Sequence, residues 1–292
     1  SEMCIRDSYS TGHNVSSFSS KDLSEWTIRH GVFSAPPQWA VDSIKGYEGH
    51  TWAPDIIYYK GNYHLFYSCS AFGKNTSAIG HAYRRTLNPD SDEPWTDTGA
   101  VIVSHARDNF NAIDPNIVID EEGNPWMTFG SFWGGIQLVR LTEDLTSTLK
   151  PEKLYTICTR QFEGASDVPS RSVNSVEAPF IFKHGDYYYL FVSYDFCCRG
   201  LKSDYKVVVG RSTRVTGPYV DKDGRELTRG GGSLVVDSND EFVAIGHSAA
   251  YHFDGKDYFM AHGYSRSEDG ASKLFFREMT WDEEGWPFVS AE

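Results

Sequence analysis

The sequence predicts an all-β protein, a five-bladed β-propeller whose first blade is incomplete at the N-terminus. Two observations lead to this prediction. An apolar run, a turn with glycine and an aromatic run recur in that order along the 292 residues. Repeats of a few tens of residues with several strands each indicate a propeller or a solenoid. Aromatic residues make up 15% of the chain, which favours strands over helices.

The spacing of the repeats sets the expected number of blades. Pro54, Pro115 and Pro179 begin three of the apolar runs and lie roughly 60 residues apart, which leaves room for four strands in each blade. Proline cannot donate to a strand ladder, so it is expected at the first position of a strand or at an edge. Four complete units and the end of an earlier one make five blades.

The first unit is the incomplete one. Residues 1–8 carry no strand alternation and do not fit the repeat, so we interpret them as a non-native segment. The repeat pattern resumes at Tyr9, and Ser10 matches Ser68 of the second unit. The opening strand of the first blade is therefore expected to be missing, and residues 9–292 are expected to form a single domain.

The four complete units share one frame, in which a glycine turn separates two strands. They comprise Trp52–Ser68, Ile113–Ser131, Ser175–Phe191 and Gly246–His262, with turns at Gly61, Gly123, Gly185 and Gly255.

Charge and cysteine content restrict the function classes. The formal net charge of −13 argues against nucleic acid as a partner, because phosphates require a basic surface. No run of 18 or more apolar residues occurs, so a membrane span is not expected. The 5 cysteines show no metal-site spacing. The adjacent Cys197 and Cys198 are compatible with two reduced thiols or with a vicinal disulfide, and the sequence leaves both open.

Two carboxylates are the candidate catalytic residues. The starts of equivalent inner strands converge at one end of a propeller channel, and Asp114 and Glu177 lie one or two positions before the repeat's proline. Glycoside hydrolysis requires two such groups, one that protonates the leaving oxygen and another that activates water or stabilises charge. The second unit has Ala53 before its proline, so the carboxylate is not a requirement of the repeat. Asp114 could alternatively be a turn residue, since Asp-Pro initiates turns.

The chain resembles glycoside hydrolase family 43 and, within it, the endo-α-1,5-L-arabinanases. The resemblance extends from about Tyr9 to the C-terminus. It is carried by Trp52-Ala53-Pro54-Asp55, Phe110–Pro115, Gly130-Ser131-Phe132-Trp133, Glu177-Ala178-Pro179, Cys197-Cys198, Gly210-Arg211-Ser212, Gly217–Asp221, Gly230–Gly232 and Gly246-His247.

This resemblance implies an inverting mechanism with three carboxylates. Glu177 matches the general acid, and Asp114 matches the aspartate that orients this acid and raises its pKa. The general base of the family lies in an opening His-Asp-Pro segment that this sequence does not contain, and Asp7 does not match it. Since general-base catalysis contributes roughly 10²- to 10⁴-fold, we expect the chain as written to have little activity.

The resemblance also implies residues that bind substrate and an ion. Trp52, Phe72 and Trp133 match aromatic platforms for sugar rings, and Asn111 and Ser131 are expected to form hydrogen bonds with the substrate. The alternative for the aromatic residues is packing.

His247 matches an axial histidine that coordinates an ion, often assigned as Ca²⁺, mostly through water in the central channel. Because Ca²⁺ prefers oxygen ligands, water is expected to supply most of them. The alternative for His247 is a structural role.

Two other functions remain open. One is an arabinofuranosidase or xylosidase of the same family, and the other is a non-catalytic arabinan-binding propeller, suggested by the missing base. The expected partner is arabinan or an arabino-oligosaccharide, and the protein is expected to be a secreted or periplasmic monomer. Whether cleavage is internal or terminal depends on loops that close the groove, which the sequence leaves open.

Overall fold

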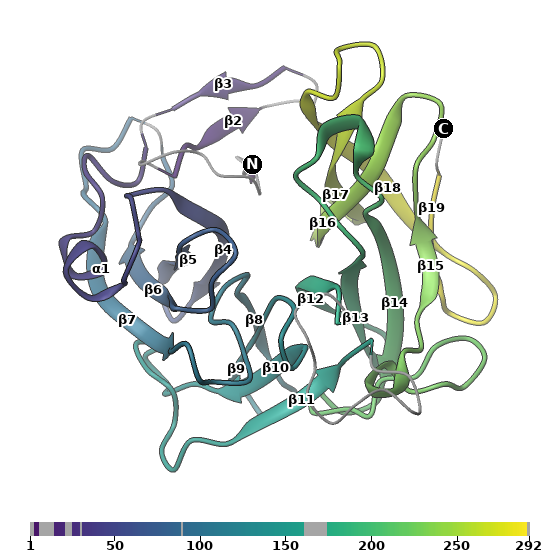
Figure 1. The fold of residues 1–292 in the computed structure, drawn as a ribbon, viewed down its shortest axis with the longest axis horizontal. Helices are drawn as coiled ribbons and strands as arrows, with labels where there is room; N and C mark the ends of the chain where they lie inside the picture. Colours follow the sequence, from purple (N-terminus) through teal and green to yellow (C-terminus); the bar gives the residue numbers. More distant parts are fainter. Residues whose placement is uncertain are drawn as a thin grey trace. The chain divides into compact units, whose positions relative to one another are not determined.

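The computed structural model describes residues 3–5, 15–20, 25–29, 31–88, 90–160 and 174–290, with the backbone alone described for residues 3–5. These residues form an all-β chain, as predicted, with strands in five sheets (Figure 1). The helical elements among them are short, namely α1 (Gln38–Ser43) and the 3-10 helices η1 (Gly200–Lys202) and η2 (Leu227–Arg229).

Four of the five sheets have four strands, and their strands are neighbours in chain order. One sheet comprises β4 (Thr51–Tyr59), β5 (Asn62–Cys69), β6 (Ser77–Arg84) and β7 (Thr96–Ser104). The next has the order β11 (Leu154–Cys158), β10 (Ile136–Arg140), β9 (Pro125–Phe129) and β8 (Asn116–Ile119). The third comprises β12 (Val176–His184), β13 (Tyr187–Tyr194), β14 (Lys206–Ser212) and β15 (Ser233–Val236). The fourth comprises β16 (Phe242–Phe253), β17 (Lys256–Ser265), β18 (Ser272–Trp281) and β19 (Pro287–Val289).

These four sheets are the blades of a β-propeller, which confirms that part of the prediction. The remaining sheet has three strands in the described residues, β1 (Met3–Ile5), β2 (Phe18–Ser20) and β3 (Thr27–Ile28). The count of five blades therefore stays a prediction. Of the segment 1–8 that we interpret as non-native, only β1 is described, and Asp7 lies outside the described residues.

The predicted glycine turns connect the first two strands of each complete blade. In the β4–β5 hairpin Lys60 and Gly61 have φ values of 46° and 88°, and in the β16–β17 hairpin Asp254 and Gly255 have values of 50° and 76°. Two consecutive positive φ angles are the requirement of a type I′ turn, whose twist matches that of the strands it joins. The glycine in each repeat is therefore explained by turn geometry.

An irregularity recurs near the start of the inner strands. The residue at this point has a left-handed backbone, with φ values of 43° at Ala53, 58° at Asp114, 53° at Ala178 and 53° at His247. In β4, β12 and β16 the strand register shifts at the same place, as in a β-bulge. Bulges of this kind are frequent beside active sites because they redirect a side chain.

The left-handed residue of each bulge aligns the repeats, and this alignment corrects the counterpart that the sequence suggested for Glu177. Asp114 is equivalent to Ala178, whereas Glu177 is equivalent to Trp52 and Gly246, one position earlier. Ala53 is therefore not the counterpart of Glu177. The two predicted catalytic carboxylates occupy neighbouring positions of the repeat and not the same one.

The chain divides into two compact units, Ser1–Phe129 with Val139–Lys153 and Gly130–Leu138 with Leu154–Glu292. Each has its own apolar core. In the first unit the core includes Leu65, Tyr67 and Ala82. In the second it includes Phe191, Phe259 and Phe275, which lie on β13, β17 and β18.

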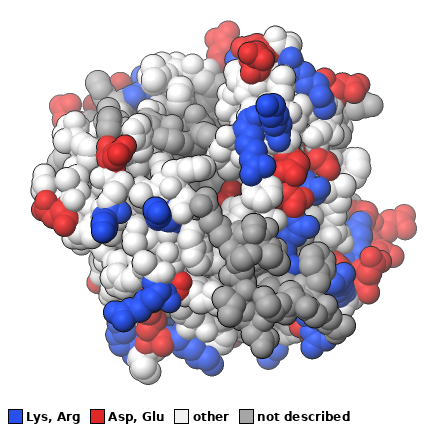
Figure 2. All heavy atoms as spheres, in the orientation of Figure 1, with Lys and Arg blue, Asp and Glu red and all other residues white. Residues whose placement is uncertain are grey.

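The surface carries charged side chains of both signs, as Figure 2 shows for one face. The formal net charge is −13, so acidic residues are in excess over the whole chain. No helix in the described part of the chain is long and apolar enough to cross a membrane.

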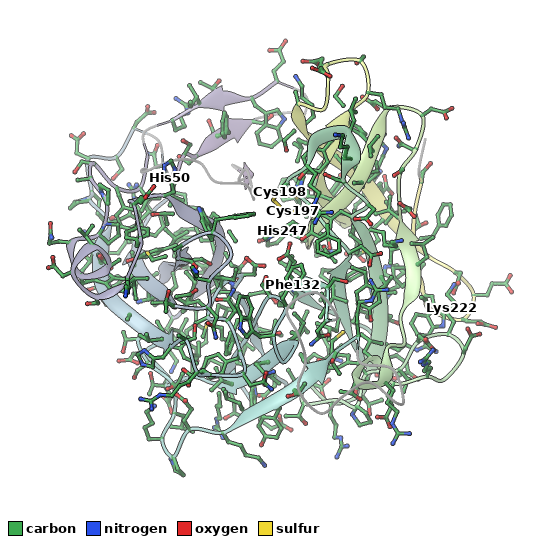
Figure 3. The ribbon with its side chains drawn as sticks, viewed as in Figure 1. His50, Phe132, Cys197, Cys198, Lys222 and His247 are labelled. Atoms are coloured by element: carbon green, nitrogen blue, oxygen red, sulfur yellow. A yellow bond between two sulfur atoms is a disulfide. The ribbon has the colours of Figure 1, made fainter. Side chains whose placement is uncertain are left out.

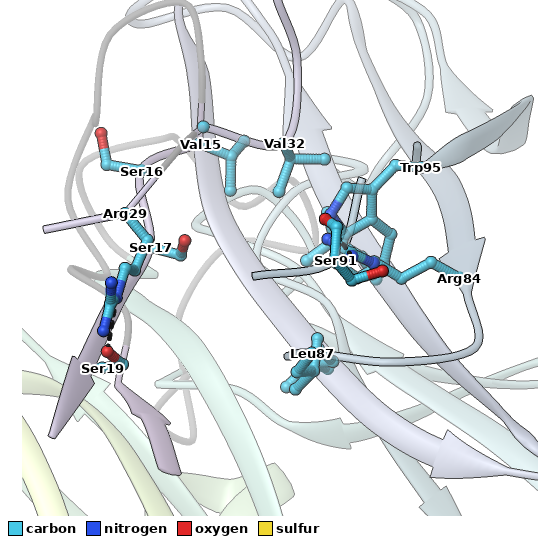
Figure 4. A pocket seen from close by; sticks show the side chains of 13 residues that line it. Val15, Ser16, Ser17, Ser19, Arg29, Val32, Arg84, Leu87, Ser91 and Trp95 are labelled. Atoms are coloured by element: carbon cyan, nitrogen blue, oxygen red, sulfur yellow. Dashed lines mark hydrogen bonds between the residues drawn. The ribbon is translucent and has the colours of Figure 1, made fainter. Parts of the chain in front are cut away.

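The first unit contains a small pocket with a volume of about 90 Å³ (Figure 4). Arg29, Arg84 and Trp95 contribute to its lining, and the Nε atom of Arg29 donates a hydrogen bond of 2.7 Å to Ser19 Oγ. None of the predicted site residues lines this pocket.

Candidate active site

Glu177 lies at the beginning of β12, directly before the bulge. It is paired with Ser193 of β13, and the regular ladder resumes only at Phe180, opposite Phe191. Between these pairs lie Ala178, which has a left-handed backbone, and Pro179, which has no N–H to donate. The sequence Glu-Ala-Pro thus interrupts the ladder at the position where the candidate acid is needed.

Both oxygens of the Glu177 carboxyl accept a hydrogen bond from a hydroxyl group. Ser131 Oγ donates to Oε2 over 2.6 Å, and Tyr205 OH donates to Oε1 over 2.7 Å. Ser131 follows β9 and Tyr205 precedes β14, so two segments far apart in the sequence orient the carboxyl. A carboxyl with both oxygens held has a fixed orientation, which a general acid requires.

Burial raises the pKa of Glu177 above its ordinary value, and the hydrogen bonds from Ser131 and Tyr205 oppose that rise. The effect of burial prevails, because removing a carboxylate from water disfavours its charged form. The residue nevertheless keeps some accessible surface. A carboxyl whose protonated form is favoured by burial and that can still be reached is suited to proton donation.

Ser131 is held by a tightly folded loop between β9 and β10. A Cβ atom on Gly130 would lie 2.7 Å from the carbonyl oxygen of Gly135, and one on Gly135 would lie 2.2 Å from that of Cys158. The N–H of Phe132 donates to the carbonyl of Val176 over 2.8 Å, which fastens this loop to β12. Close approach of the backbone therefore explains both glycines and fixes Ser131 beside Glu177.

Tyr205 was not predicted from the sequence. Its side chain is fully buried, and its ring packs against Gly246 of β16. A Cβ atom on Gly246 would lie only 2.1 Å from the Cδ1 atom of this ring. Glycine in the interior of a strand often marks such a close approach, and this was the available signal.

Ser131 and Trp133 were predicted to contact substrate. The structure gives the hydroxyl of Ser131 a protein partner, the carboxyl of Glu177. Trp133 is partly exposed, and its carbonyl accepts a hydrogen bond of 2.8 Å from Asn174 Nδ2. Its ring as a sugar platform stays a prediction.

His247 follows Gly246 at the bulge of β16, and its N–H donates to Ser193 Oγ over 2.8 Å. Burial lowers the pKa of its imidazole to about 4, so the ring is neutral near pH 7 and can act as a ligand. In the described part of the chain no group of three His, Cys, Asp or Glu side chains is arranged to hold a metal ion. An ion held by His247 and water stays a prediction.

Four predicted site residues lie in the first of the two compact units. Asp114 is buried, and its N–H donates to Ser68 Oγ over 3.0 Å. Asn111 is also buried, and its Oδ1 atom accepts a 2.6 Å hydrogen bond from Ser77 Oγ. Trp52 is partly exposed, and Phe72 is 77% exposed. The roles predicted for these four residues, including the action of Asp114 on Glu177, stay predictions.

Cys197 and Cys198 form a vicinal disulfide, which settles the state that the sequence left open (Figure 3). The Sγ atom of Cys197 lies 3.6 Å from the Oε1 atom of Glu177. The sequence pattern gave no indication of this contact.

A carboxyl whose pKa is raised by burial and whose two oxygens are held by hydroxyl groups is suited to be the general acid of a glycosidase. Residues 5–287 match the profile of glycosyl hydrolases family 43. The chain belongs to this family.

Three similar proteins align with this chain over nearly its whole length. An extracellular exo-α-(1→5)-L-arabinofuranosidase of Cellvibrio japonicus is 47% identical over 283 residues, which are 96% of this chain and 82% of that protein. An extracellular endo-α-(1→5)-L-arabinanase of Bacillus subtilis is 40% identical over 92% of this chain and 77% of its own length. The structure of Cellvibrio cellulosa α-L-arabinanase complexed with arabinohexaose matches with a TM-score of 0.92 and 45% identity, covering 99% of this chain and 94% of that one.

Proposed function

We propose that this chain hydrolyses α-1,5-L-arabinofuranosidic bonds of arabinan. The observation that supports this function most directly is the buried Glu177 carboxyl, with both oxygens held, in a family member 47% identical to an exo-α-(1→5)-L-arabinofuranosidase. The arabinohexaose in the complex of the Cellvibrio cellulosa protein supports the same class of substrate.

In the proposed mechanism Glu177 protonates the oxygen of the leaving sugar as the glycosidic bond breaks. Ser131 and Tyr205 hold the carboxyl in place, and burial raises its pKa, which favours the protonated form that a general acid needs. Asp114 is proposed to keep the acid oriented and protonated. A further carboxylate would activate water on the opposite face of the sugar, which inverts the anomeric centre.

Two modes of cleavage are compatible with this chemistry. The motif series of the sequence favours cleavage of internal bonds, and the endo-α-(1→5)-L-arabinanase of Bacillus subtilis, 40% identical, supports that mode. Release of sugars from a chain end is the second candidate, because the Cellvibrio japonicus relative, 47% identical, is named an exo-acting enzyme.

Product analysis on linear arabinan tests the function and separates the modes. We expect short arabino-oligosaccharides to be released by a chain that carries the base-bearing opening strand of the family. Internal cleavage should lower the viscosity of the solution early, when few new reducing ends have formed. Terminal cleavage should release reducing ends at a nearly constant viscosity.

Three outcomes would contradict the proposal. Release of xylose from xylan with no product from arabinan would favour the xylosidase alternative, and release of arabinose only from branched side chains would favour an arabinofuranosidase of other specificity. Binding of arabino-oligosaccharide without any product would favour the non-catalytic propeller and the predicted loss of the general base. Xylan and branched arabinan are therefore measured in parallel.

The proposed ion at His247 has its own prediction. A hydrated Ca²⁺ would supply positive charge at the site, with the neutral imidazole of His247 as its protein ligand. After dialysis against Ca²⁺-free buffer, elemental analysis should find about one ion per chain in the wild type and none in His247→Ala, because one ligand of the protein holds it. The control is His252→Ala, a mostly exposed histidine of the same strand. Equal ion content in His247→Ala and the wild type would refute ligation.

An extracellular location is the proposed one. The Cellvibrio japonicus and Bacillus subtilis relatives are both named extracellular. The Cys197–Cys198 disulfide agrees with this location, because disulfides persist mainly in oxidising compartments.

A further inference from the structure

The disulfide between Cys197 and Cys198 lies directly beside the candidate acid. Its Cys197 sulfur is 3.6 Å from Oε1 of Glu177, the oxygen that also accepts the hydrogen bond from Tyr205. A sulfur atom in a disulfide has no hydrogen, so in this state it cannot donate to the carboxyl. A free thiol at the same position could donate, since S–H is a weak hydrogen-bond donor.

The segment that carries the disulfide is anchored independently of it. The N–H of Phe196 donates to Asp204 Oδ1 over 2.9 Å, and the N–H of Cys198 donates to Tyr264 OH over 2.7 Å. The Phe196 ring also packs against the Phe132 ring at a centroid distance of 5.7 Å. These contacts would keep the Cys197 sulfur near Glu177 after the S–S bond is broken.

Other titratable groups lie near the carboxyl, and Tyr264, which accepts from the N–H of Cys198, packs against the His262 ring at a centroid distance of 5.4 Å. Tyr205 faces Oε1, and His262 lies behind its ring at a centroid distance of 5.9 Å. His247 is 6.5 Å beyond His262, with the pKa of both imidazoles lowered by burial.

A charged residue, Asp195, lies beside Ser175, and Ser175 precedes Glu177 by two positions. Asp195 forms ion pairs with Arg160 and Lys206, and Ser175 Oγ donates to its carboxylate over 3.4 Å. Reduction of the disulfide changes the hydrogen-bonding capacity of Cys197 and leaves these charges unaltered.

We propose that Cys197 is a positioning residue whose redox state sets the proton affinity of Glu177. As a disulfide it offers the carboxyl an apolar sulfur and no donor, which favours the protonated acid. As a thiol it becomes an additional donor to Oε1, which favours the carboxylate. The catalytic meaning of this inference rests on the proposed function, in which Glu177 is the general acid. The effect of Cys197 on the proton affinity of Glu177 does not depend on catalysis.

The redox step requires an external dithiol. The dithiol transfers two electrons and two protons to the S–S bond, which breaks to give the Cys197 and Cys198 thiols, and the reductant becomes a cyclic disulfide. A small-molecule disulfide accepts two electrons and two protons from the two thiols and leaves as two thiols itself, so the Cys197–Cys198 bond reforms and the donor is removed. The site would therefore hold its proton most firmly in the oxidised protein.

Titration of Glu177 by ¹³C NMR tests this inference without requiring turnover. The protein is labelled at the glutamate carboxyl carbons, and Glu177→Gln assigns the signal. Two variants break the same disulfide: Cys198→Ala leaves the Cys197 thiol, and Cys197→Ala removes it. We expect the pKa of Glu177 to fall by about half a unit or more in Cys198→Ala and in the wild type reduced with dithiothreitol. We expect little change in Cys197→Ala, with or without the reductant.

Tyr205→Phe provides the matched test of sensitivity, because removal of a donor to the same oxygen should move the pKa of Glu177 upward. Equal shifts in Cys197→Ala and Cys198→Ala would overturn the proposal, since loss of the ring constraint would then be the cause. No shift in Cys198→Ala and in the reduced wild type, while Tyr205→Phe does shift, would also overturn it. If either variant fails to fold, the comparison of oxidised and reduced wild type decides.

Activity on arabinan is measured separately, so that the two proposals can fail independently. If Glu177 is the acid, a lower pKa moves the upper limb of the pH profile of kcat/KM to lower pH, and roughly half a unit corresponds to about threefold less activity above that pKa. A shift in the titration without activity in any form of the protein would refute the function and leave the inference about Cys197 intact.

Discussion

Glu177→Gln is expected to lower the rate of arabinan hydrolysis by roughly 10²- to 10⁴-fold, which is the usual contribution of a general acid. Glutamine has nearly the same shape, but only its carbonyl oxygen can accept from one of the two hydroxyl groups of Ser131 and Tyr205, while its NH₂ group donates to the other hydroxyl; it has no proton to transfer to the leaving oxygen. Substrate affinity should change little. The measurement is kcat and KM on linear arabinan, with binding of an arabino-oligosaccharide followed by calorimetry.

Glu122→Gln is the matched control, because Glu122 is an exposed glutamate in the turn between β8 and β9. It makes the same change in charge and should retain the wild-type rate. A rate close to that of the wild type in Glu177→Gln would remove Glu177 from the role of acid. A loss of binding equal to the loss of rate would instead indicate a residue needed for substrate affinity.

At high pH, Glu177→Gln should be more stable than the wild type. Burial raises the pKa of Glu177 in the folded state, so folding is favoured by the proton on this residue. The contribution of this proton to the free energy of unfolding is fully present below the pKa that Glu177 has in the unfolded chain. It is lost as the pH rises through the pKa that Glu177 has in the folded protein. Above that pH the wild type contains a buried carboxylate and Glu177→Gln does not, so the variant should have the higher Tm. A Tm difference independent of pH would show that Glu177 is not perturbed in the folded state.

The repeat frame could be predicted from sequence because each of its parts has a local cause. Pro54, Pro115 and Pro179 mark the strand starts where a ladder hydrogen bond is absent, and the glycines mark turns that need positive φ angles. Glu177 could be found because it precedes one of these prolines. The counterpart of Glu177 in the second repeat, taken as Ala53, was one position in error, because the left-handed residue of the bulge aligns Ala53 with Ala178 and so Trp52 with Glu177.

The environment of Glu177 could not be predicted, because it is made by contacts between distant segments. Tyr205 precedes β14 and has no feature in the sequence that distinguishes it from the other 16 of the 17 tyrosines. Ser131 was found, but its hydrogen bond to Glu177 was not predicted, and its contact with substrate stays a prediction. The adjacent cysteines were noticed, whereas their approach to the acid depends on the packing of the segment around Phe196.

Gly246→Ala is expected to destabilise the protein and to impair the site at the same time. The added Cβ atom would lie 2.1 Å from the Tyr205 ring, which is fully buried and cannot move without shifting its surroundings. Overpacking of this kind costs about 1–3 kcal/mol of stability. Displacement of the ring also withdraws the hydroxyl from Glu177 Oε1, and misplacement of about 1 Å can cost on the order of 100-fold in rate. Denaturant unfolding and kcat/KM per folded molecule measure the two effects.

Gly80→Ala separates the loss of stability from the loss of orientation. Gly80 lies in β6 of the first unit, and a Cβ atom there would meet the buried Tyr67 ring at 2.4 Å, nearly the same clash. The hydroxyl of Tyr67 donates to Asp97 over 2.7 Å, a pair that includes no predicted site residue. Both variants should therefore unfold at lower denaturant concentration, but only Gly246→Ala should lose activity per folded molecule. Equal losses of activity in the two variants would mean that overpacking lowers the rate wherever it occurs, and Tyr205 would then have no particular role in holding the acid.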